Sequence, residues 1–297
     1  MKTIGFNRYY KKFGIFSLIL IIFSLLLLFF KGLNYGVDFK GGTLIEIRLE
    51  NSDHSISKVR DVFGNSNLPN LSVKNFGNDK DYIIKFKKQN LDDPEYINNL
   101  KTEVSKSFPD INFRRVENVG PKVSSELLKS GIIAISLSLA AMLFYIWIRF
   151  EWQFSLGAIA ALFHDVIITL GIFSLLSLEI NLSIVAAVLT IVGYSMNDTV
   201  VIFDRVRENL KKYSDIKIFD LTNISINETL SRTIITSTTT LLALFSIFIF
   251  GGEILKGFSL AMILGVIFGT YSSIYIANPI LVLLNVDQKT ILKEENN

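Results

Sequence analysis

Long apolar runs separated by polar segments dominate the sequence. Six of these runs are long enough, once flanking residues are included, to cross the roughly 30 Å hydrocarbon core of a membrane. In all they contain two formally charged side chains, Asp165 and Asp198. The pattern therefore predicts an α-helical integral membrane protein with six transmembrane helices, at Phe13–Phe30, Ile132–Ile148, Phe154–Leu178, Leu182–Phe203, Thr233–Phe250 and Phe258–Leu284.

The segment between the first two runs has a different composition. Residues 31–129 contain 30 charged residues and form no apolar run of that length, so they predict one soluble domain inserted after the first span. The remaining expected parts are an N-terminal cytoplasmic segment with the first span (1–30), a five-helix transmembrane region (130–285) and a cytoplasmic tail (286–297). No small-residue cleavage site precedes Lys31, which favours an uncleaved signal anchor.

Alternating and helical spacings follow one another within the inserted domain. Thr43–Glu50 alternates apolar and polar residues, as a half-buried strand does. Ser55 is a candidate cap for the helix that follows it. The predicted order β-α-β-β-α-β is that of the ferredoxin-like split βαβ motif, so we expect a small α+β ferredoxin-like extracytoplasmic domain. After Thr43–Glu50, the expected elements are Ser55–Phe63, Leu71–Phe76, Tyr82–Lys87, Asp93–Phe108 and Ile111–Val116.

Positive charge in the short loops predicts the orientation. The N-terminal segment carries four Lys or Arg residues and 204–232 carries six, whereas the loops at 179–181 and 251–257 together carry only Lys256. Because Lys and Arg accumulate in cytoplasmic loops, both termini are expected in the cytoplasm and residues 31–129 outside it.

Composition excludes several classes of function. The chain has 297 residues, 50% of them hydrophobic and 19% charged, and it has no cysteine. A disulfide scaffold, a thiolate zinc site and a thiol enzyme are therefore excluded, and a net charge of +3 is too small to suggest nucleic acid. Gly41-Gly42 lacks the spacing of a phosphate loop, and we find no paired catalytic carboxylates in the inserted domain. We expect no enzyme, metal site or bound cofactor.

Asp198 is the strongest candidate for chemistry inside the membrane. It lies five residues before the end of its apolar run, at Phe203, which is about 8 Å along a helix. Ionisable residues at such depth are costly and are functional hypotheses by default. We interpret Asp198 as a carboxylate suited to reversible protonation. The alternative is a structural residue capped by Asn197 and Thr199 and bonded to a neighbouring helix.

Other polar groups in the spans leave two interpretations open. Adjacent side chains on a helix point about 100° apart, so we do not expect His164 and Asp165 to form a facing pair. A proton pathway and a structural hydrogen bond are both compatible with these two residues. Arg232 is either an anchor paired with Glu228 or the counter-charge to Asp198.

Two further patterns have structural interpretations. Ser195, His164 and Asp198 suggest a serine protease, but Ser195 is followed by Met196 rather than by the expected glycine. The apolar residues of Ile218–Leu230 predict a short amphipathic helix on the inner membrane surface. A stripe of small residues every four positions in the last span is typical of close helix packing: Gly257, Ala261, Gly265, Gly269, Ser273 and Ala277.

Four segments together resemble the bacterial SecD/SecF family of the resistance-nodulation-division (RND) superfamily. Gly36–Thr43 resembles its first signature and Gly120–Val123 its second. Gly193–Arg205 resembles the fourth-span motif of the SecF branch, and Ser231–Thr240 the start of the fifth span. The resemblance extends in consistent order from about residue 7 to 285. It implies one six-span half of a pseudo-symmetric RND-type pair, acting late in Sec-dependent protein export with the proton-motive force.

The resemblance also implies roles for particular residues. Asp198 would be the proton-responsive carboxylate and Arg232 its partner, with Asn197 in the same relay. His164 and Asp165 would form a secondary relay. The coupling of the first span to the outer domain would involve Gly36, Asp38, Gly41 and Gly42.

The implied partners are a SecD-like subunit, the SecYEG channel, YajC, the exported preprotein and membrane lipid, with no nucleic acid. Protons would be the coupling ion, and the expected location is the bacterial inner membrane. Two alternatives remain: half of an RND-type small-molecule exporter, although the inserted domain is compact for that role, and a non-transporting assembly factor of the channel.

Overall fold

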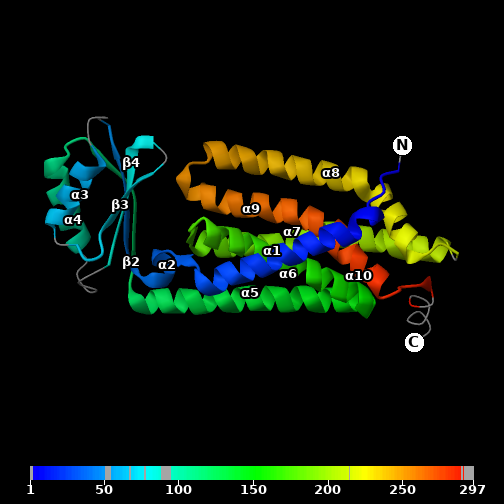
Figure 1. Ribbon diagram of the computed structural model, residues 1–297. Coiled ribbons are helices and arrows are strands. Elements are labelled where there is room, and N and C mark those ends of the chain that lie inside the picture. The colour runs from blue at the N-terminus through cyan, green and yellow to red at the C-terminus, as the bar shows by residue number, and fades with distance from the viewer. Residues whose placement is uncertain are drawn as a thin grey trace. The chain divides into compact units, whose positions relative to one another are not determined.

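Six long helices carry the apolar runs, as the sequence predicts (Figure 1). The computed structural model describes residues 3–50, 55–66, 68–76, 78–87, 95–213, 215–288 and 290, without the side chains of 76–79, 253 and 254. All six helices are long and apolar enough to cross a membrane. They are α1 (Tyr10–Phe30), α5 (Pro121–Arg149), α6 (Trp152–Leu175), α7 (Leu182–Lys212), α8 (Ile218–Phe250), and α9 (Glu253–Ser272) continued by a π-helical turn (Ser273–Ala277) and α10 (Asn278–Leu283).

The chain divides into two compact units. One comprises Met1–Asn34 and Ile133–Asn297, and the other is Tyr35–Ile132. The expected soluble domain was 31–129. Short elements at the chain's turns are a 3-10 helix at Asn7–Tyr9, β1 (Asn34–Tyr35) and β6 (Glu179–Ile180).

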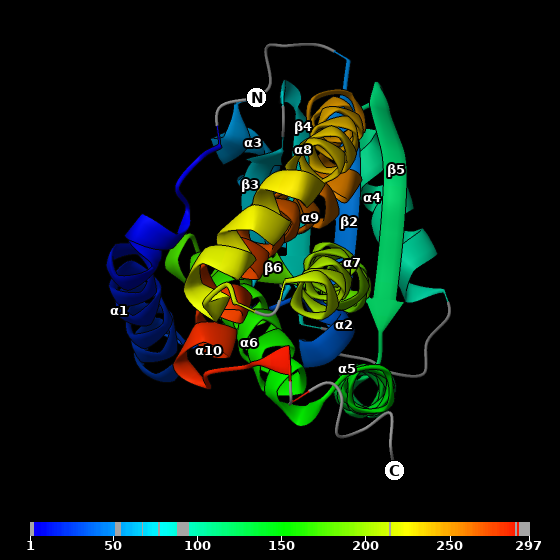
Figure 2. The same cartoon turned by 90° about the vertical axis from the view of Figure 1, so that its right-hand side faces the viewer.

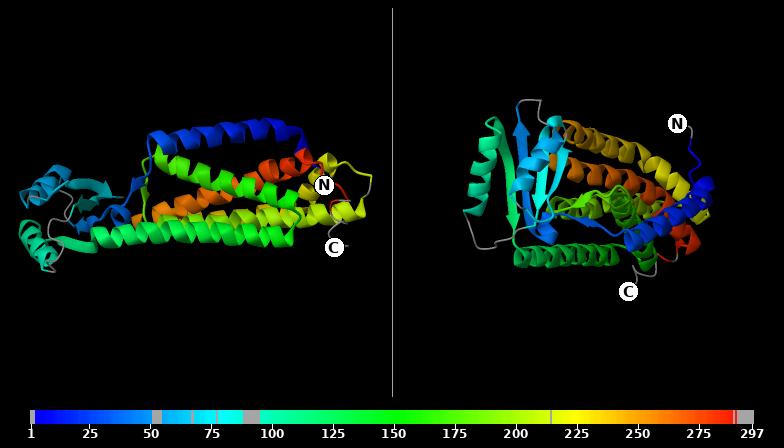
Figure 3. Two further views of the ribbon diagram at one scale, coloured as in Figure 1. Left: turned by 90° about the horizontal axis from the view of Figure 1, so that it is seen from below. Right: turned by 60° about the vertical axis from the view of Figure 1, so that its left-hand side comes forward.

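Three helices form the interior of the helical unit. At least half of the most apolar 18-residue stretch is buried in α6, in α7 and in the α9–α10 span, against less than a fifth in α1, α5 and α8. The views in Figures 2 and 3 place α1 and α5 on opposite flanks of α6. The interior helices therefore form the part of the unit in which a buried polar group can be held by several neighbours.

The helix α8 differs from the expectation of a separate amphipathic helix at its start. It runs without a break from Ile218 to Phe250. Leu221 and Ile226 are buried in one apolar cluster with Val206 and Leu210 of α7. The prediction of a membrane-surface helix is wrong because a neighbouring helix, rather than the membrane surface, covers these apolar side chains.

The second unit contains the expected order of strands and helices. A four-stranded antiparallel sheet has the order β3-β4-β2-β5, and Figure 1 shows α3 and α4 on one face of it. Ser55 caps α3 by accepting a hydrogen bond from the Lys58 backbone N–H at 3.3 Å, as predicted. Residues 93 and 94 of the expected second helix lie outside the described residues. The elements are α2 (Val37–Lys40), β2 (Gly42–Leu49), α3 (Ile56–Asn65), β3 (Ser72–Phe76), β4 (Asn78–Phe86), α4 (Tyr96–Ser107) and β5 (Ile111–Val119).

Both faces of β2 are buried, although its pattern predicts one buried face. Ile45, Ile47 and Leu49 pack in the core with α3 and α4. On the opposite face Glu46 is 5% exposed and lies 3.6 Å from the Arg115 guanidinium. The difference arises because β2 is a central strand, so that side chains of β4 and β5 lie beside it on both faces.

A lysine on this polar face is expected to titrate near neutral pH. Burial, reinforced by the nearby Lys74 ammonium, lowers the pKa of Lys85 to about 8. The folded protein thus binds this proton less tightly than the unfolded chain. The residue's destabilising effect is complete below pH 8, and stability rises as the pH increases from about 8 towards the unfolded value of about 10.4.

Competitive acetylation followed by mass spectrometry checks this prediction. The reactivity of Lys85 should reach half its maximum near pH 8, against about 10.4 for an unperturbed lysine. The substitution Lys85→Met should remove the rise in stability between these values. A midpoint near 10 would contradict the assignment.

Candidate functional site

Asp198 lies on α7 between hydroxyl groups of the two helices that flank it. Its side chain is 3% exposed. Oδ2 accepts hydrogen bonds from the Thr270 hydroxyl of α9 at 3.1 Å and from the Ser237 hydroxyl of α8 at 3.4 Å. These two hydroxyls are 2.8 Å apart and bonded to each other. A change in the charge of Asp198 therefore acts directly on α7, α8 and α9.

Arg232 of α8 is near Asp198 without contacting it. Its charge acts electrostatically on the carboxylate, yet no ion pair within 4.0 Å joins Arg232 to any carboxylate among the described residues. Glu228, the other partner considered for Arg232, is bonded to Arg205 at 2.7 Å and to Asn209 at 2.7 Å. Arg232 is exposed on the surface of the six-helix unit.

The two neighbours of Asp198 in the chain do not cap it. Asn197 is exposed. The Thr199 hydroxyl donates to the Ser195 carbonyl oxygen of its own helix at 3.3 Å. Asp198 therefore takes its hydrogen bonds from other helices.

A second buried carboxylate, Asp165 of α6, receives three hydrogen bonds. His164 Nδ1 lies 2.8 Å from Oδ1, and the hydroxyls of Ser195 (2.6 Å) and Ser272 (2.8 Å) donate to Oδ2. Neither His164 nor Asp165 is exposed to solvent. The carboxylate thus connects α6 to both α7 and α9.

The expectation that His164 and Asp165 would not face each other is wrong. Nδ1 is close to the backbone on the imidazole ring, and the carboxylate rotates about its own bond, so both groups reach into the angle of about 100° between neighbouring helical positions. The other ring nitrogen, Nε2, is buried and has no hydrogen-bond partner among the described residues. The ring of Tyr271 stacks on the imidazole at 5.8 Å.

This arrangement is not a serine-protease triad. In such a triad the serine hydroxyl bonds to the histidine, which the aspartate orients. Here Ser195 donates to Asp165 directly, whereas Asp198, the acid of the suggested triad, is bonded to Thr270 and Ser237. Three or more His, Cys, Asp or Glu side chains able to hold a metal ion do not gather anywhere in the described part of the chain.

The stripe of small residues in the last span faces α7. A Cβ added at Gly265 would lie 2.3 Å from Ile191, and one at Gly269 would lie 3.1 Å from the Ser195 Cα. A Cβ at Gly257 would lie 3.2 Å from Ile184, and Ala261 and Ser273 are buried. The absence of side chains lets α9 approach α7 closely beside Asp198.

The two glycines of the first signature segment are held against the start of α5. Gly36 caps α2, which includes Asp38. Gly41 and Gly42 have φ values of +73° and +133°. A Cβ at Gly42 would lie 2.8 Å from the Phe86 carbonyl oxygen, and one at Gly41 would lie 3.2 Å from the Ser124 hydroxyl of α5. The first and second signature segments therefore meet within one unit.

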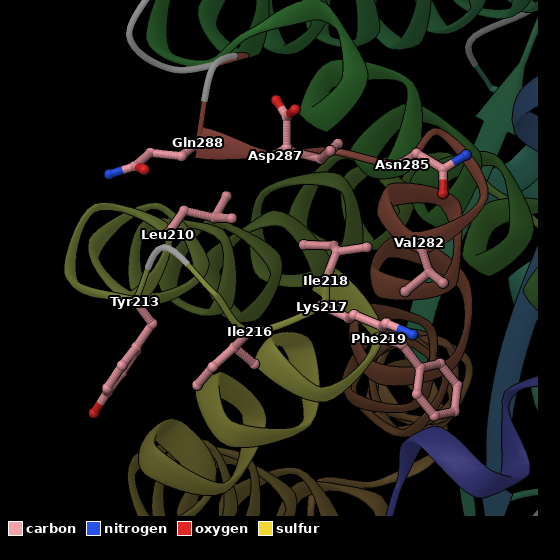
Figure 4. A pocket seen from close by; sticks show the side chains of 11 residues that line it. Leu210, Tyr213, Ile216, Lys217, Ile218, Phe219, Val282, Asn285, Asp287 and Gln288 are labelled. Carbon is pink, nitrogen blue, oxygen red and sulfur yellow. The ribbon is translucent and has the colours of Figure 1, made fainter.

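A cavity of about 320 Å³ lies where α7 ends and α8 begins (Figure 4). It contains none of the predicted relay residues. Its lining is largely apolar, with polar groups from Lys217, Asn285, Asp287 and Gln288. The two buried carboxylates thus remain the candidates for proton binding.

The hydroxyl donors to both carboxylates were missed in the sequence as ligands. They are Ser195, Ser237, Thr270 and Ser272. Their signal is weak, because a Ser or Thr within a span commonly bonds to its own helix. Thr239, Ser246 and Ser259 do so here.

Comparison with known proteins places these features in one family. Residues 99–287 match the family model described as protein export membrane protein SecD/SecF, C-terminal, and residues 26–53 match that of the SecD/SecF GG motif. Protein translocase subunit SecF of Rickettsia bellii is 46% identical over 90% of this chain and 89% of its own length. The Vibrio alginolyticus subunit is 42% identical over 98% and 93%.

Solved structures agree with this match. The crystal structure of SecDF, a translocon-associated membrane protein from Thermus thermophilus, superposes with a TM-score of 0.83 at 33% identity. It covers 95% of this chain, whereas this chain spans 38% of the length of SecDF. SecDF in its super-membrane-facing form gives a TM-score of 0.70 at 32% identity. This six-span chain therefore belongs to the SecD/SecF family of protein export membrane proteins and is a multi-pass protein of the inner membrane.

Proposed function

We propose that this chain is the SecF-like accessory subunit of the Sec translocase and uses the proton-motive force, together with a SecD-like partner, to complete protein export. The observation that carries this proposal is the buried Asp198 carboxylate, bonded to hydroxyls of α8 and α9. Protonation removes the charge that these donors and the Arg232 guanidinium attract. The three helices then change their relative positions, and the outer domain moves with them.

The available energy is sufficient for such a switch. Moving one proton through 100 mV supplies about 2.3 kcal/mol. That energy changes a two-state equilibrium by roughly fiftyfold. Protons serve as the coupling ion in this proposal, with no cofactor and no enzymatic reaction.

A SecD-like partner is supported by polar groups on the outside of the six-helix unit. Asn197 of α7 and Arg232 and Thr238 of α8 are all exposed. Polar side chains in a span rarely face lipid, because hydrocarbon offers them no hydrogen bonds. A second six-span half would cover them and bring its own polar residues to Arg232. SecYEG, YajC and the exported preprotein complete the proposed assembly.

The finer architecture belongs to the same proposal. The strand order β3-β4-β2-β5, with two helices on one face, supports a ferredoxin-like class for the outer domain. The excess of Lys and Arg in the N-terminal segment and in 204–232 supports cytoplasmic termini and an extracytoplasmic domain.

Asp198→Asn is expected to abolish the proton-driven part of export. Asparagine keeps the size of the side chain but cannot carry the exchangeable charge. In inverted vesicles that contain the partner and the channel, the stimulation of translocation by a proton gradient, which reaches roughly fiftyfold at most for one charge at 100 mV, should disappear.

The matched control is Asp204→Asn on the same helix. Asp204 forms an exposed ion pair with Arg149 at 2.7 Å, and such pairs contribute little, so stimulation should persist. Persistence of stimulation in Asp198→Asn would reject the relay and favour an assembly factor. Unchanged export with altered drug accumulation in cells lacking the chain would instead favour a small-molecule exporter.

A further inference from the structure

The end of α9 contacts both buried carboxylates through neighbouring residues. Thr270 donates to Asp198 at 3.1 Å, and Ser272 donates to Asp165 at 2.8 Å. Between them, Tyr271 stacks on His164 and donates its hydroxyl to the Phe13 carbonyl oxygen of α1. Two residues on a helix are about 200° apart. The helix α9 therefore lies between the carboxylates and presents one hydroxyl to each.

The helix α7 is bonded to the same two sites. Ser195 donates to Asp165 at 2.6 Å, and Asp198 follows three residues later. A Cβ added at Gly269 would lie 3.1 Å from the Ser195 Cα and 3.6 Å from Asp165 Oδ2, so α7 and α9 touch here at the backbone. One oxygen of Asp165 thus joins both helices beside the Thr270–Asp198 hydrogen bond.

A π-helical turn follows directly after Ser272. It comprises Ser273–Ala277, and the Asn278 side chain donates to the Ser273 carbonyl oxygen at 2.7 Å. On its far side, a Cβ added at Gly157 of α6 would lie 2.8 Å from the Ala277 carbonyl oxygen. Because α6 contacts the chain on both sides of the turn, α6 sets the rotation of α9 about its own axis. Such turns occur frequently at functional sites.

We propose that Asp165 is a positioning residue for Asp198: by holding Ser195 of α7 and Ser272 of α9, it keeps Thr270 on the Asp198 carboxylate. This inference rests on the proposed function and adds to it a residue that acts through α9. Rotation of α9 away from Asp165 moves Thr270 on the opposite side of the helix, so the two hydrogen bonds depend on each other.

Few other charged groups face either site. On Asp165, α6 contributes His164, α7 contributes the neutral Ser195, and α9 contributes the neutral Ser272. Tyr271 of α9 is stacked on His164 and is bonded to Ser17 of α1 at 2.8 Å. On Asp198, α8 contributes Arg232 by charge and Ser237 by a hydrogen bond, and α9 contributes Thr270. A change at Ser272 therefore reaches Asp198 through helix position.

The test follows the protonation of Asp198 itself. The chain with its partner, in native membranes, is labelled with dicyclohexylcarbodiimide, which reacts with protonated carboxyl groups, and the modified peptide is quantified by mass spectrometry at each pH. Thr270→Val removes the donor directly and defines the size and sign of the reference shift. Loss of one hydrogen bond predicts a shift of about half a pH unit or more, a threefold or larger change in proton affinity.

Ser272→Ala and Ser195→Ala should each reproduce at least half of that reference shift with the same sign. Ser272→Ala combined with Thr270→Val should add little to Thr270→Val alone, because both remove the same contact. Ser272→Thr retains the hydroxyl and should restore the unmodified midpoint. The matched control is Ser259→Ala, a buried serine of α9 that donates to the Leu255 carbonyl oxygen of its own helix, and its midpoint should not change.

Two negative results are distinguishable. If Asp198 in the unmodified complex shows no pH-dependent labelling, the proposed function fails and this inference fails with it. If Asp198 titrates and both serine variants fold, copurify with the partner and keep the original midpoint, only the positioning role of Asp165 is rejected. Ser195 and Ser272 lie on different helices, so one folded variant with an unchanged midpoint is sufficient to reject that role.

Discussion

Replacing Gly171 with alanine is expected to weaken the packing of α1 on α6 strongly. A Cβ at this position would lie 2.4 Å from both Cβ and Oγ of Ser24, and 2.9 Å from its Cα. The backbone of α1 must therefore move. Overpacking of this kind costs about 1–3 kcal/mol. The apparent midpoint of thermal unfolding in detergent should fall accordingly.

The same contact offers a compensating change. Ser24→Gly removes the two nearest atoms, so Gly171→Ala should cost much less in that background than alone. Gly14→Ala is the matched control on α1, because a Cβ there has no atom within 4 Å and alanine favours helix. Equal losses for Gly171→Ala in both backgrounds would show that Ser24 is not the obstacle.

Gly42→Ala is expected to loosen the outer domain selectively. The residue has a φ of +133°, which L residues rarely adopt, and its Cβ would lie 2.8 Å from the Phe86 carbonyl oxygen. Strain of this type costs about 1–3 kcal/mol, and the close contact adds to it. Hydrogen–deuterium exchange should rise in peptides from β2, β4 and β5 and stay unchanged in α6, α7 and α9.

Gly64→Ala provides the control within the same domain. Gly64 lies in α3, and a Cβ there meets no atom within 4 Å. Alanine in a helix is more favourable than glycine by roughly 0.5–1 kcal/mol, so exchange in α3 should slow. Fast exchange confined to α3 in both variants, or none in Gly42→Ala, would contradict the role given to the glycine pair.

These two glycines illustrate different limits of sequence analysis. Gly42 belongs to a pattern that drew attention, but its sequence does not say that a carbonyl oxygen of a distant strand lies beside it. Gly171 belongs to no noted pattern, and its importance depends on Ser24, which is 147 positions away. In each case the constraint is the atom opposite the missing side chain, and the chain fold alone brings that atom there.

Other expectations failed for a related reason. The segment Ile218–Leu230 has the periodicity of a surface helix, and Thr43–Glu50 has that of a half-buried strand. Periodicity reports which side of an element is apolar, but not what covers each side. Packing of α8 on α7 covers Leu221, and the central place of β2 in its sheet buries Glu46.

By itself the sequence determined the six spans, the inserted domain with its order of elements, and the scarcity of charge that makes Asp165 and Asp198 conspicuous. Each of these follows from local physics, since a span must be continuously apolar and a strand or helix must match its own period. Only the tertiary structure decided that Asp198 bonds to Thr270 and Ser237 while Arg232 stands apart, and that Asp165 holds His164, Ser195 and Ser272. A hydroxyl in a span can bond equally well to its own helix, so its choice of a carboxylate depends on how the helices pack.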